Sequence, residues 1–153
     1  MLRQIEVLVE DDALAIDVES VEKLLHFLDA EVTQWTLPSG DLSVAFVTKE
    51  RCSELHATFF NDPSITDVMT FPGDVEDKYA GDLAICPAHA ASQAPDYGTT
   101  FPEELTLYLL HGWLHLAGLD DRSENDRSAM REAEKTLQAI TGNSGYRLSV
   151  VYQ

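Results

Sequence analysis

Cysteine is scarce in this chain of 153 residues, and long apolar runs are missing. Cys52 and Cys86 are its two cysteines; in a chain without an export signal, such a pair is typical of reduced, buried thiols in the cytosol. We expect both thiols to pack in the interior rather than to bind a metal. No window approaches the roughly eighteen apolar residues of a membrane span, and the first residues lack the hydrophobic region of a signal peptide. The sequence therefore predicts a cytoplasmic protein that has no membrane partner.

Positive charge is also scarce, because 10 Lys and Arg residues stand against 27 Asp and Glu residues and give a formal net charge of −17. Proteins that hold nucleic acid by its phosphates normally present a basic face. This balance argues against free DNA as a partner. An RNA substrate has to be held by a small cationic cluster, by a metal or by a larger partner. The acidity also keeps the protein soluble, which is the plain alternative explanation for it.

Repeats, low-complexity tracts and long linkers are absent from the sequence, and its length suits one domain, residues 1–153. Short apolar or alternating segments rich in β-forming residues predict four strands, and apolar residues at helical spacing predict helices between and after them. The expected fold class is α+β, with a four-stranded mixed sheet packed with helices. The strands are expected at 5–9, 42–47, 68–71 and 81–86, and the helices at 17–28, 50–61, 88–94, 102–116 and 123–140.

Local signals set several of these expected boundaries. Pro72-Gly73 is expected to stop the third strand, with an acidic loop at 74–77 after it, and 95–100 is expected to be a loop. Pro102 suits the first turn of a helix, and Ser123 is a candidate N-cap of the last helix. Gly142 is expected to lie beyond the end of that helix.

Residues 111–121 have the sequence His-Gly-Trp-Leu-His-Leu-Ala-Gly-Leu-Asp-Asp, which is typical of a metal site. On a helix, His111 and His115 project from one face, one turn apart, so both imidazoles can bind one ion. Gly118 can end the helix in a left-handed conformation and let the chain return Asp121 as a third ligand. Three protein ligands leave one coordination position open, as catalytic zinc sites do. The alternative is that both histidines are hydrogen-bonded core residues of an apolar helix.

The same spacing occurs in the metzincin proteases, whose motif begins His-Glu-x-x-His. Gly112 stands here in place of the glutamate that serves those proteases as general base. The hypothesis of a peptidase therefore loses support, although the candidate metal ligands are still present. The hypothesis of an iron(II) oxygenase with two histidines and one carboxylate has less support still, because those ligands usually lie on a β-rich barrel.

Residues 111–120 resemble the hallmark His-Gly-x-Leu-His-Leu-x-Gly-Tyr-Asp-His of the YbeY family, bacterial endoribonucleases that mature ribosomal RNA. The residues that stand where this motif places them are His111, Gly112, Leu114, His115, Leu116, Gly118 and Asp120. The segments 66–72 (Thr-Asp-Val-Met-Thr-Phe-Pro) and 81–85 (Gly-Asp-Leu-Ala-Ile) are also similar to segments of that family. Glu104, Met130 and Glu134 stand where the family has the same residue types. The resemblance implies one α+β domain with a zinc ion, and a hydrolase acting near the three-prime end of small-subunit ribosomal RNA. It also implies a ribosomal particle or ribosomal proteins as partners.

Two departures from the family pattern bear on the chemistry. Asp121 replaces the third metal-binding histidine, and a set of two histidines and one carboxylate suits zinc but also iron(II), manganese or nickel. Asp120 competes for this role, although the family spacing places the ligand at 121. The second difference is Phe60, where the family often has an arginine thought to face the phosphate; His56 replaces a nearby asparagine.

A phosphoryl transition state gathers negative charge, so the missing arginine needs a substitute. Arg122 adjoins the third ligand and is a candidate for this catalytic role. Arg127, Arg131 and Lys135 follow at four-residue steps along the last predicted helix and are candidate RNA contacts. The alternative is that they pair with neighbours such as Glu124 and Glu134 on a solvated helix face.

The leading hypothesis is a zinc-dependent endoribonuclease of ribosomal RNA processing and ribosome quality control. The general base is either water activated by the metal or a nearby carboxylate such as Asp82. Asp67, Asp82 and Asp120 are alternatively residues that orient the ligand imidazoles. A different hypothesis is a metal-binding ribosome-assembly factor with little nuclease activity.

Overall fold

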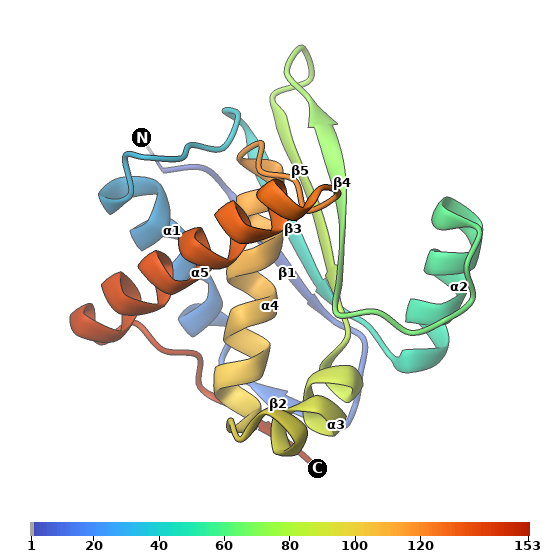
Figure 1. Ribbon diagram of the computed structural model, residues 1–153. Coiled ribbons are helices and arrows are strands. Elements are labelled where there is room, and N and C mark those ends of the chain that lie inside the picture. Colours follow the sequence, from blue (N-terminus) through green and yellow to red (C-terminus); the bar gives the residue numbers. More distant parts are fainter. Residues whose placement is uncertain (1) are drawn as a thin grey trace.

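The computed structural model describes residues 2–153 and has the predicted α+β architecture (Figure 1). The main sheet has the strand order β1-β3-β5-β4. Strands β1, β3 and β5 are parallel, whereas β4 pairs antiparallel with β5 and forms one edge, so the sheet is mixed. The four strands are β1 (Ile5–Val9), β3 (Asp41–Phe46), β4 (Val68–Asp74) and β5 (Tyr79–Ile85).

Five helices accompany this sheet in the described part of the chain. Helices α1 and α4 cover one face of the sheet, and α5 crosses the outer side of α4 (Figure 1). Helix α2 stands apart from the others and buries only Cys52. The helices are α1 (Val18–Glu31), α2 (Lys49–Phe60), α3 (Pro87–Tyr97), α4 (Phe101–Leu116) and α5 (Glu124–Ser144).

Successive side chains of a strand point to opposite faces of the sheet, and two apolar clusters form as a result, one on each face. Val44, Leu83 and Ile85 point into the main core with α1, α4 and α5. Ala84 on the other face joins a smaller cluster beneath α2. Cys52 and Cys86 belong to that second cluster as buried free thiols, which agrees with the expected packing role.

Helix α4 has a strong start signal, and this fixes the position of its histidines. Thr100 is the N-cap and accepts a hydrogen bond from the Glu103 backbone N–H, while the Glu103 carboxylate accepts one from the Thr100 backbone. This capping box and Pro102 in the first turn satisfy or remove donors that the helix leaves unpaired. The helix ends at Leu116, and Gly118 then takes a φ of +108°, as the spacing predicted.

Three predicted boundaries were wrong, each for a local reason. Strand β4 continues through Pro72 to Asp74 because it is an edge strand, where proline removes no ladder hydrogen bond. Helix α3 continues through Pro95 to Tyr97, and Gly98 ends it in the left-handed conformation. Helix α5 includes Gly142 and ends at Ser144, with Gly145 as its left-handed cap.

A second, two-stranded sheet was not predicted. Strands β2 (Leu14–Ile16) and β6 (Val150–Tyr152) pair antiparallel near the two ends of the chain. None of the helices in residues 2–153 combines the length and the apolarity that crossing a bilayer needs.

Candidate metal centre

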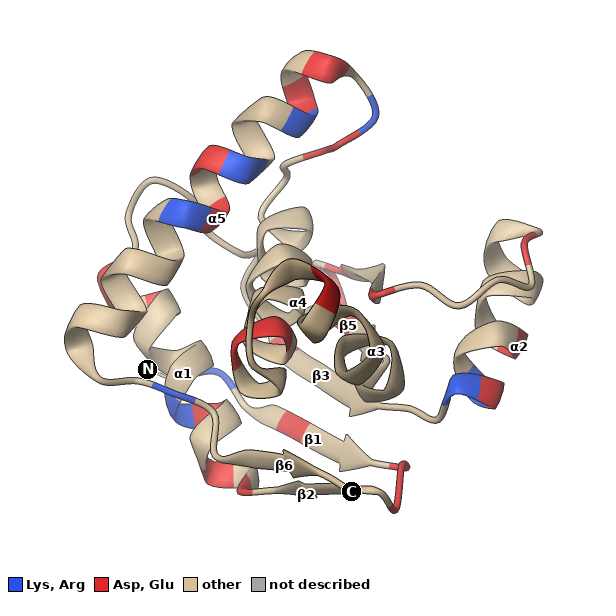
Figure 2. Cartoon of the chain, turned by 60° about the horizontal axis from the view of Figure 1, so that its bottom comes forward, with Lys and Arg blue, Asp and Glu red and all other residues tan. Residues whose placement is uncertain are grey.

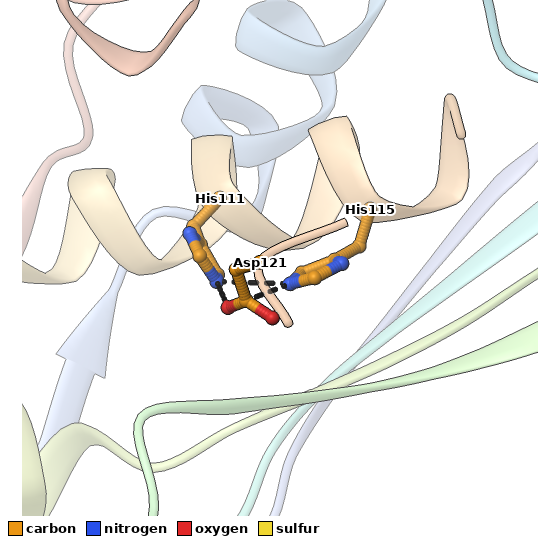
Figure 3. A group of neighbouring side chains, drawn as sticks. All are labelled: His111, His115 and Asp121. Carbon is orange, nitrogen blue, oxygen red and sulfur yellow. Dashed lines mark hydrogen bonds and ion pairs between the residues drawn. The ribbon is translucent and has the colours of Figure 1, made fainter. Parts of the chain in front are cut away.

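The two motif histidines converge at one point, as their helical spacing predicted. His111 and His115 lie one turn apart on α4, and their Nε2 atoms are 3.1 Å from each other (Figure 3). The rings meet nearly edge to face, with 81° between their planes. Their side chains are 17% and 20% exposed, so the pair lies at the rim of the core. This position disfavours the alternative in which both are enclosed core residues.

Asp121 completes a triangle of possible ligand atoms. The turn at Gly118 brings the chain back, and Asp121 Oδ2 lies 3.4 Å from His111 Nε2 and 3.4 Å from His115 Nε2 (Figure 3). Zinc bonds of about 2.0–2.1 Å in a tetrahedral arrangement separate neighbouring ligand atoms by about 3.3 Å. The three edges therefore fit a four-coordinate divalent ion. The Asp121 side chain is 42% exposed, so the triangle is open to solvent on the side of this carboxylate.

Hydrogen bonds outside the triangle hold each imidazole in the orientation that a metal needs. His111 Nδ1 donates to Glu134 Oε2 on α5 at 2.5 Å, and His115 Nδ1 donates to the backbone carbonyl of Leu119 at 3.0 Å. A proton on Nδ1 leaves the Nε2 lone pair free for a metal. Glu134 was noted in the sequence only as a family match and as a possible ion-pair partner on α5; its contact with His111 requires the crossing of α4 and α5.

The acidic surroundings also affect the charge of His111. Burial by itself would lower the pKa of His111, but the hydrogen bond to Glu134 and the charges of Asp67, Glu134 and Asp121 outweigh it. The pKa of His111 is therefore raised above its ordinary value in the metal-free chain. The same negative field favours a cation at the ligand triangle.

Gly112 explains why the glutamate of the metzincin motif has no counterpart here. A Cβ atom at this position would lie 2.9 Å from Leu83 Cδ2 and 3.0 Å from Val68 Cγ2. Position 112 thus faces the sheet, where α4 packs closely on β4 and β5. A carboxylate there would be pressed into the apolar core, which disfavours the peptidase alternative.

The expected orienting residues lie around the triangle without joining it. Asp120 Oδ1 accepts a hydrogen bond from the Asp121 backbone N–H, and Asp120 Oδ2 lies 3.3 Å from Arg122 Nε. Asp67 accepts hydrogen bonds from the Val68 backbone and the Thr66 hydroxyl, and acts on His111 through its charge. The carboxylate that directly contacts an imidazole Nδ1 is Glu134.

The structure does not bring Asp82 to the triangle. Asp82 alternates with Leu83, which faces α4, so Asp82 points to the opposite face of β5. There it accepts a hydrogen bond from the Tyr79 hydroxyl. The expectation that Asp82 acts as general base therefore loses its geometric basis, because the sheet separates it from the two histidines.

The expected cationic residues, Arg122, Arg127, Arg131 and Lys135, are exposed. Figure 2 shows blue segments on α5 and in the loop that precedes it. Arg127 donates to the backbone carbonyl of Arg122, and Lys135 pairs with Glu132 at 3.6 Å. Within residues 2–153, Arg131 has no ion-pair partner. The alternative pairing with Glu134 is not formed, since Glu134 bonds to His111 instead.

A family model described as endoribonuclease YbeY matches residues 6–142 of this chain. The chain belongs to the YbeY family. Within the YbeY pattern, His111 and His115 keep their places, and Asp121 stands where the third ligand is expected. Phe60, which the resemblance led us to expect at the position of a family arginine, lies exposed at the end of α2.

Individual relatives agree with this assignment. The chain is 40% identical over 98 residues to an endoribonuclease YbeY of Protochlamydia amoebophila; the match covers 61% of this chain and 65% of that protein, slightly less than two thirds of its length. It is 33% identical over 128 residues to the endoribonuclease YbeY of Staphylococcus carnosus, covering 78% and 82% of the two chains. A solution structure of a Thermotoga maritima protein superposes with a TM-score of 0.63 at 28% identity, covering 92% and 91%.

Proposed function

We propose that this protein is a zinc-dependent endoribonuclease that acts in ribosomal RNA processing, near the three-prime end of small-subunit RNA, and in ribosome quality control. The observation that carries the proposal is the triangle of His111 Nε2, His115 Nε2 and Asp121 Oδ2, in a chain of the YbeY family. The same proposal places the protein in the cytoplasm, where ribosomes are assembled.

Each residue of the centre has a separate task in this proposal. His111, His115 and Asp121 would hold the zinc, and Glu134 and the Leu119 carbonyl keep both imidazoles correctly oriented. A zinc ion in this place supplies Lewis-acid activation of water and stabilises negative charge on a phosphate. Arg122, next to the third ligand, is the candidate cation for the reacting phosphate. Asp120 holds Arg122 and the Asp121 backbone near the centre.

The charge of the chain supports a ribosomal particle, rather than free RNA, as the substrate. The net charge of −17 opposes association with an extended phosphate backbone. Arg131 lies one turn before Glu134 on α5, and Arg127 one turn before Arg131, so a short cationic stripe adjoins the centre. We propose that ribosomal RNA held by ribosomal proteins reaches the centre along Arg127, Arg131 and Lys135.

A metal-binding assembly factor with little nuclease activity is the second candidate. The specific observation in its favour is Phe60, which stands at the position of the family arginine and is 50% exposed. In this alternative the metal stabilises the fold and RNA is bound without cleavage.

A cleavage assay separates the two candidates. The substrate is precursor small-subunit RNA within assembled particles, and the enzyme is the wild-type chain after metal removal, with and without added zinc. The proposed nuclease cuts only with zinc, and Asp121→Ala removes cutting while binding to the particle persists. Particle binding by the wild type without zinc-dependent cleavage would favour the assembly factor.

A further inference from the structure

The two cysteines of the chain lie against each other beneath α2. Cys52 is the buried residue of α2, and Cys86 follows β5 directly and is the N-cap of α3. Their side chains are 1% and 0% exposed and pack with Val47, Met69 and Ala84 in the smaller apolar cluster. A hydrogen bond joins the two thiols. We call Cys52 and Cys86 the thiol pair.

The contact between the two thiols makes them unequal in reactivity. The hydrogen bond from the Cys86 thiol lowers the pKa of Cys52, although burial opposes this shift, and a protonated His56 lowers it further. The same contact, together with burial, raises the pKa of Cys86. The thiolate is the form of cysteine that attacks an oxidant. Cys52 is therefore the nucleophile of the pair, and Cys86 is placed to react with it in a second step.

Helix α2 is held largely by the loop that follows it. Ser53 Oγ donates to the Pro63 carbonyl, and His56 Nδ1 donates to the Ser64 carbonyl at 2.9 Å. Both contacts are local, and α2 stands apart from the helices that cover the main core (Figure 1). Segments with few buried contacts open locally at a low cost in free energy. A small oxidant can therefore reach Cys52 while the main core stays folded.

The thiol pair also holds the segment that leads into β4. The Cys52 thiol donates to the Thr66 carbonyl at 3.6 Å, and the Cys86 backbone N–H donates to the Asp67 carbonyl at 3.0 Å. The charge of Asp67 in turn acts on His111. A covalent change at the thiol pair therefore takes place next to a segment whose carboxylate acts on the candidate metal centre.

We propose that Cys52 and Cys86 are a site of reversible oxidation by peroxide, and that the disulfide they form fastens α2 to the end of β5. Disulfides of cytosolic proteins are usually transient and serve redox sensing or catalysis. A pair that lies within the fold, with one reactive and one resolving thiol, has the arrangement that such a sensor needs.

The oxidation has two steps. The Cys52 thiolate attacks one oxygen of hydrogen peroxide, the O–O bond breaks and hydroxide leaves, so that Cys52 becomes a sulfenic acid. The Cys86 sulfur then attacks the Cys52 sulfur, the S–O bond breaks, and the oxygen leaves as water with the proton of Cys86. The two thiols lose two electrons in total and the peroxide is reduced to two water molecules. A small-molecule thiol restores both cysteines by exchange.

The test treats the native full-length protein with an equal amount of hydrogen peroxide and identifies the linkage by peptide mass spectrometry without reduction. We expect loss of both free thiols, one disulfide within the chain between Cys52 and Cys86, and recovery of both thiols with dithiothreitol. Amide hydrogen exchange in α2 should slow by about tenfold or more in the oxidised protein, because the crosslink opposes local opening. Exchange in α1 is the internal control and should stay unchanged.

Two single variants separate the roles of the thiols. Cys86→Ala should accumulate a sulfenic acid at Cys52 that dimedone traps, because the resolving thiol is missing. Cys52→Ala should leave Cys86 unmodified at the same peroxide concentration. Urea unfolding of both variants establishes that the fold is intact, and the linkage in the wild type decides the proposal even where a variant is less stable.

Two free thiols in the wild type after peroxide treatment, or disulfides between chains alone, would overturn the proposal. Equal oxidation of Cys86 in the presence and absence of Cys52 would also overturn it. A disulfide that leaves hydrogen exchange in α2 unchanged would contradict the fastening of this helix. None of these measurements involves RNA or zinc, so a failure of the nuclease proposal would not alter their outcomes.

Discussion

At the scale of single residues, the ligand triangle depends on hydrogen bonds made outside it. His111 donates to a carboxylate that arrives from another helix, whereas His115 donates to a backbone carbonyl four residues away. Removal of such outer partners typically lowers metal affinity or activity by about 10- to 100-fold. Glu134 is therefore part of the centre although it offers no atom to a metal.

We expect Glu134→Gln to weaken zinc binding by about 10- to 100-fold, because a neutral amide accepts the His111 proton less strongly. Competition against a chromophoric chelator measures the affinity. Glu132→Gln, on the same helix but paired with Lys135, is the matched control and should bind zinc as the wild type does. Equal affinity of all three proteins would show that the contact between His111 and Glu134 has no role in metal binding.

The Asp121→His variant should bind zinc as tightly as the wild type or more tightly, since imidazole is a good zinc ligand and the backbone already presents this position. Asp121→Ala should lose most of the affinity. The control is Asp120→Ala, which removes the neighbouring carboxylate from the Asp121 backbone and Arg122. If Asp120→Ala abolished zinc binding while Asp121→Ala preserved it, the third ligand would be Asp120.

At the scale of elements, the centre depends on how closely α4 lies on the sheet. Gly112 allows this approach, because Val68 and Leu83 occupy the space that a side chain would fill. The capping box at Thr100 sets where the helix begins, and the turn at Gly118 sets where the third ligand returns. The candidate metal centre is thus built from one helix, the turn that ends it and one crossing helix.

Gly112→Ala should destabilise the fold by about 1–3 kcal/mol, because the added methyl group forces Leu83 and Val68 to move. Urea unfolding measures the change in the free energy of unfolding. Gly142→Ala in α5 is the matched control, since a Cβ there meets nothing within 4 Å. It should stabilise by about 0.5–1 kcal/mol through helix propensity. A neutral effect of Gly112→Ala would mean that α4 does not need this close contact.

Local patterns in the sequence predicted the four main strands, the five helices and the convergence of His111, His115 and Asp121, because each depends on spacing within one segment. The pairing of β2 with β6 could not be predicted, since both strands have three residues and lie near opposite ends of the chain. Pro72 and Pro95 misled the prediction because one lies on a sheet edge and the other in a final helical turn. Whether Asp82 and Glu134 reach the two histidines depends on which faces of the helices and of the sheet pack together. The local sequence does not encode that packing.

At the scale of the whole molecule, the acidity has consequences for stability and for RNA binding. The raised pKa of His111 means that its protonated form stabilises the metal-free fold. This stabilisation is complete below the ordinary pKa of 6.5 and is lost as pH rises through the raised value. Metal binding has the opposite dependence, because a ligand imidazole must be neutral.

In chelator-treated protein, the free energy of unfolding should therefore contain a contribution from His111 that decreases from pH 6 to pH 8. The difference between the wild type and Glu134→Gln isolates it, because that substitution removes the contact that most raises the pKa. The wild-type advantage should be larger at pH 6 than at pH 8 in urea unfolding. An equal difference in the free energy of unfolding at pH 6 and pH 8 would mean that the Glu134 carboxylate does not raise the pKa of His111.

Charge reversal of Arg127 and Arg131 together should reduce cleavage of particle-bound RNA and leave zinc content unchanged. The two side chains are exposed and supply part of the limited positive field on α5. Charge reversal of Lys23, which pairs with Glu19 on α1, is the control at a different helix. Unaltered cleavage by the double variant, or tight binding of free RNA by the wild type at physiological salt, would contradict a role for this stripe.

We propose that nuclease activity of this chain depends on one zinc ion bound by His111, His115 and Asp121. Elemental analysis of protein purified without chelators measures whether that ion is present, with Asp121→Ala prepared in parallel. We expect close to one zinc per wild-type chain and a large loss in the variant, with cleavage following zinc content when zinc is removed and restored. Equal metal content in both proteins, or a wild-type chain that binds no divalent metal even when supplied with it, would show that these three side chains are not a zinc site.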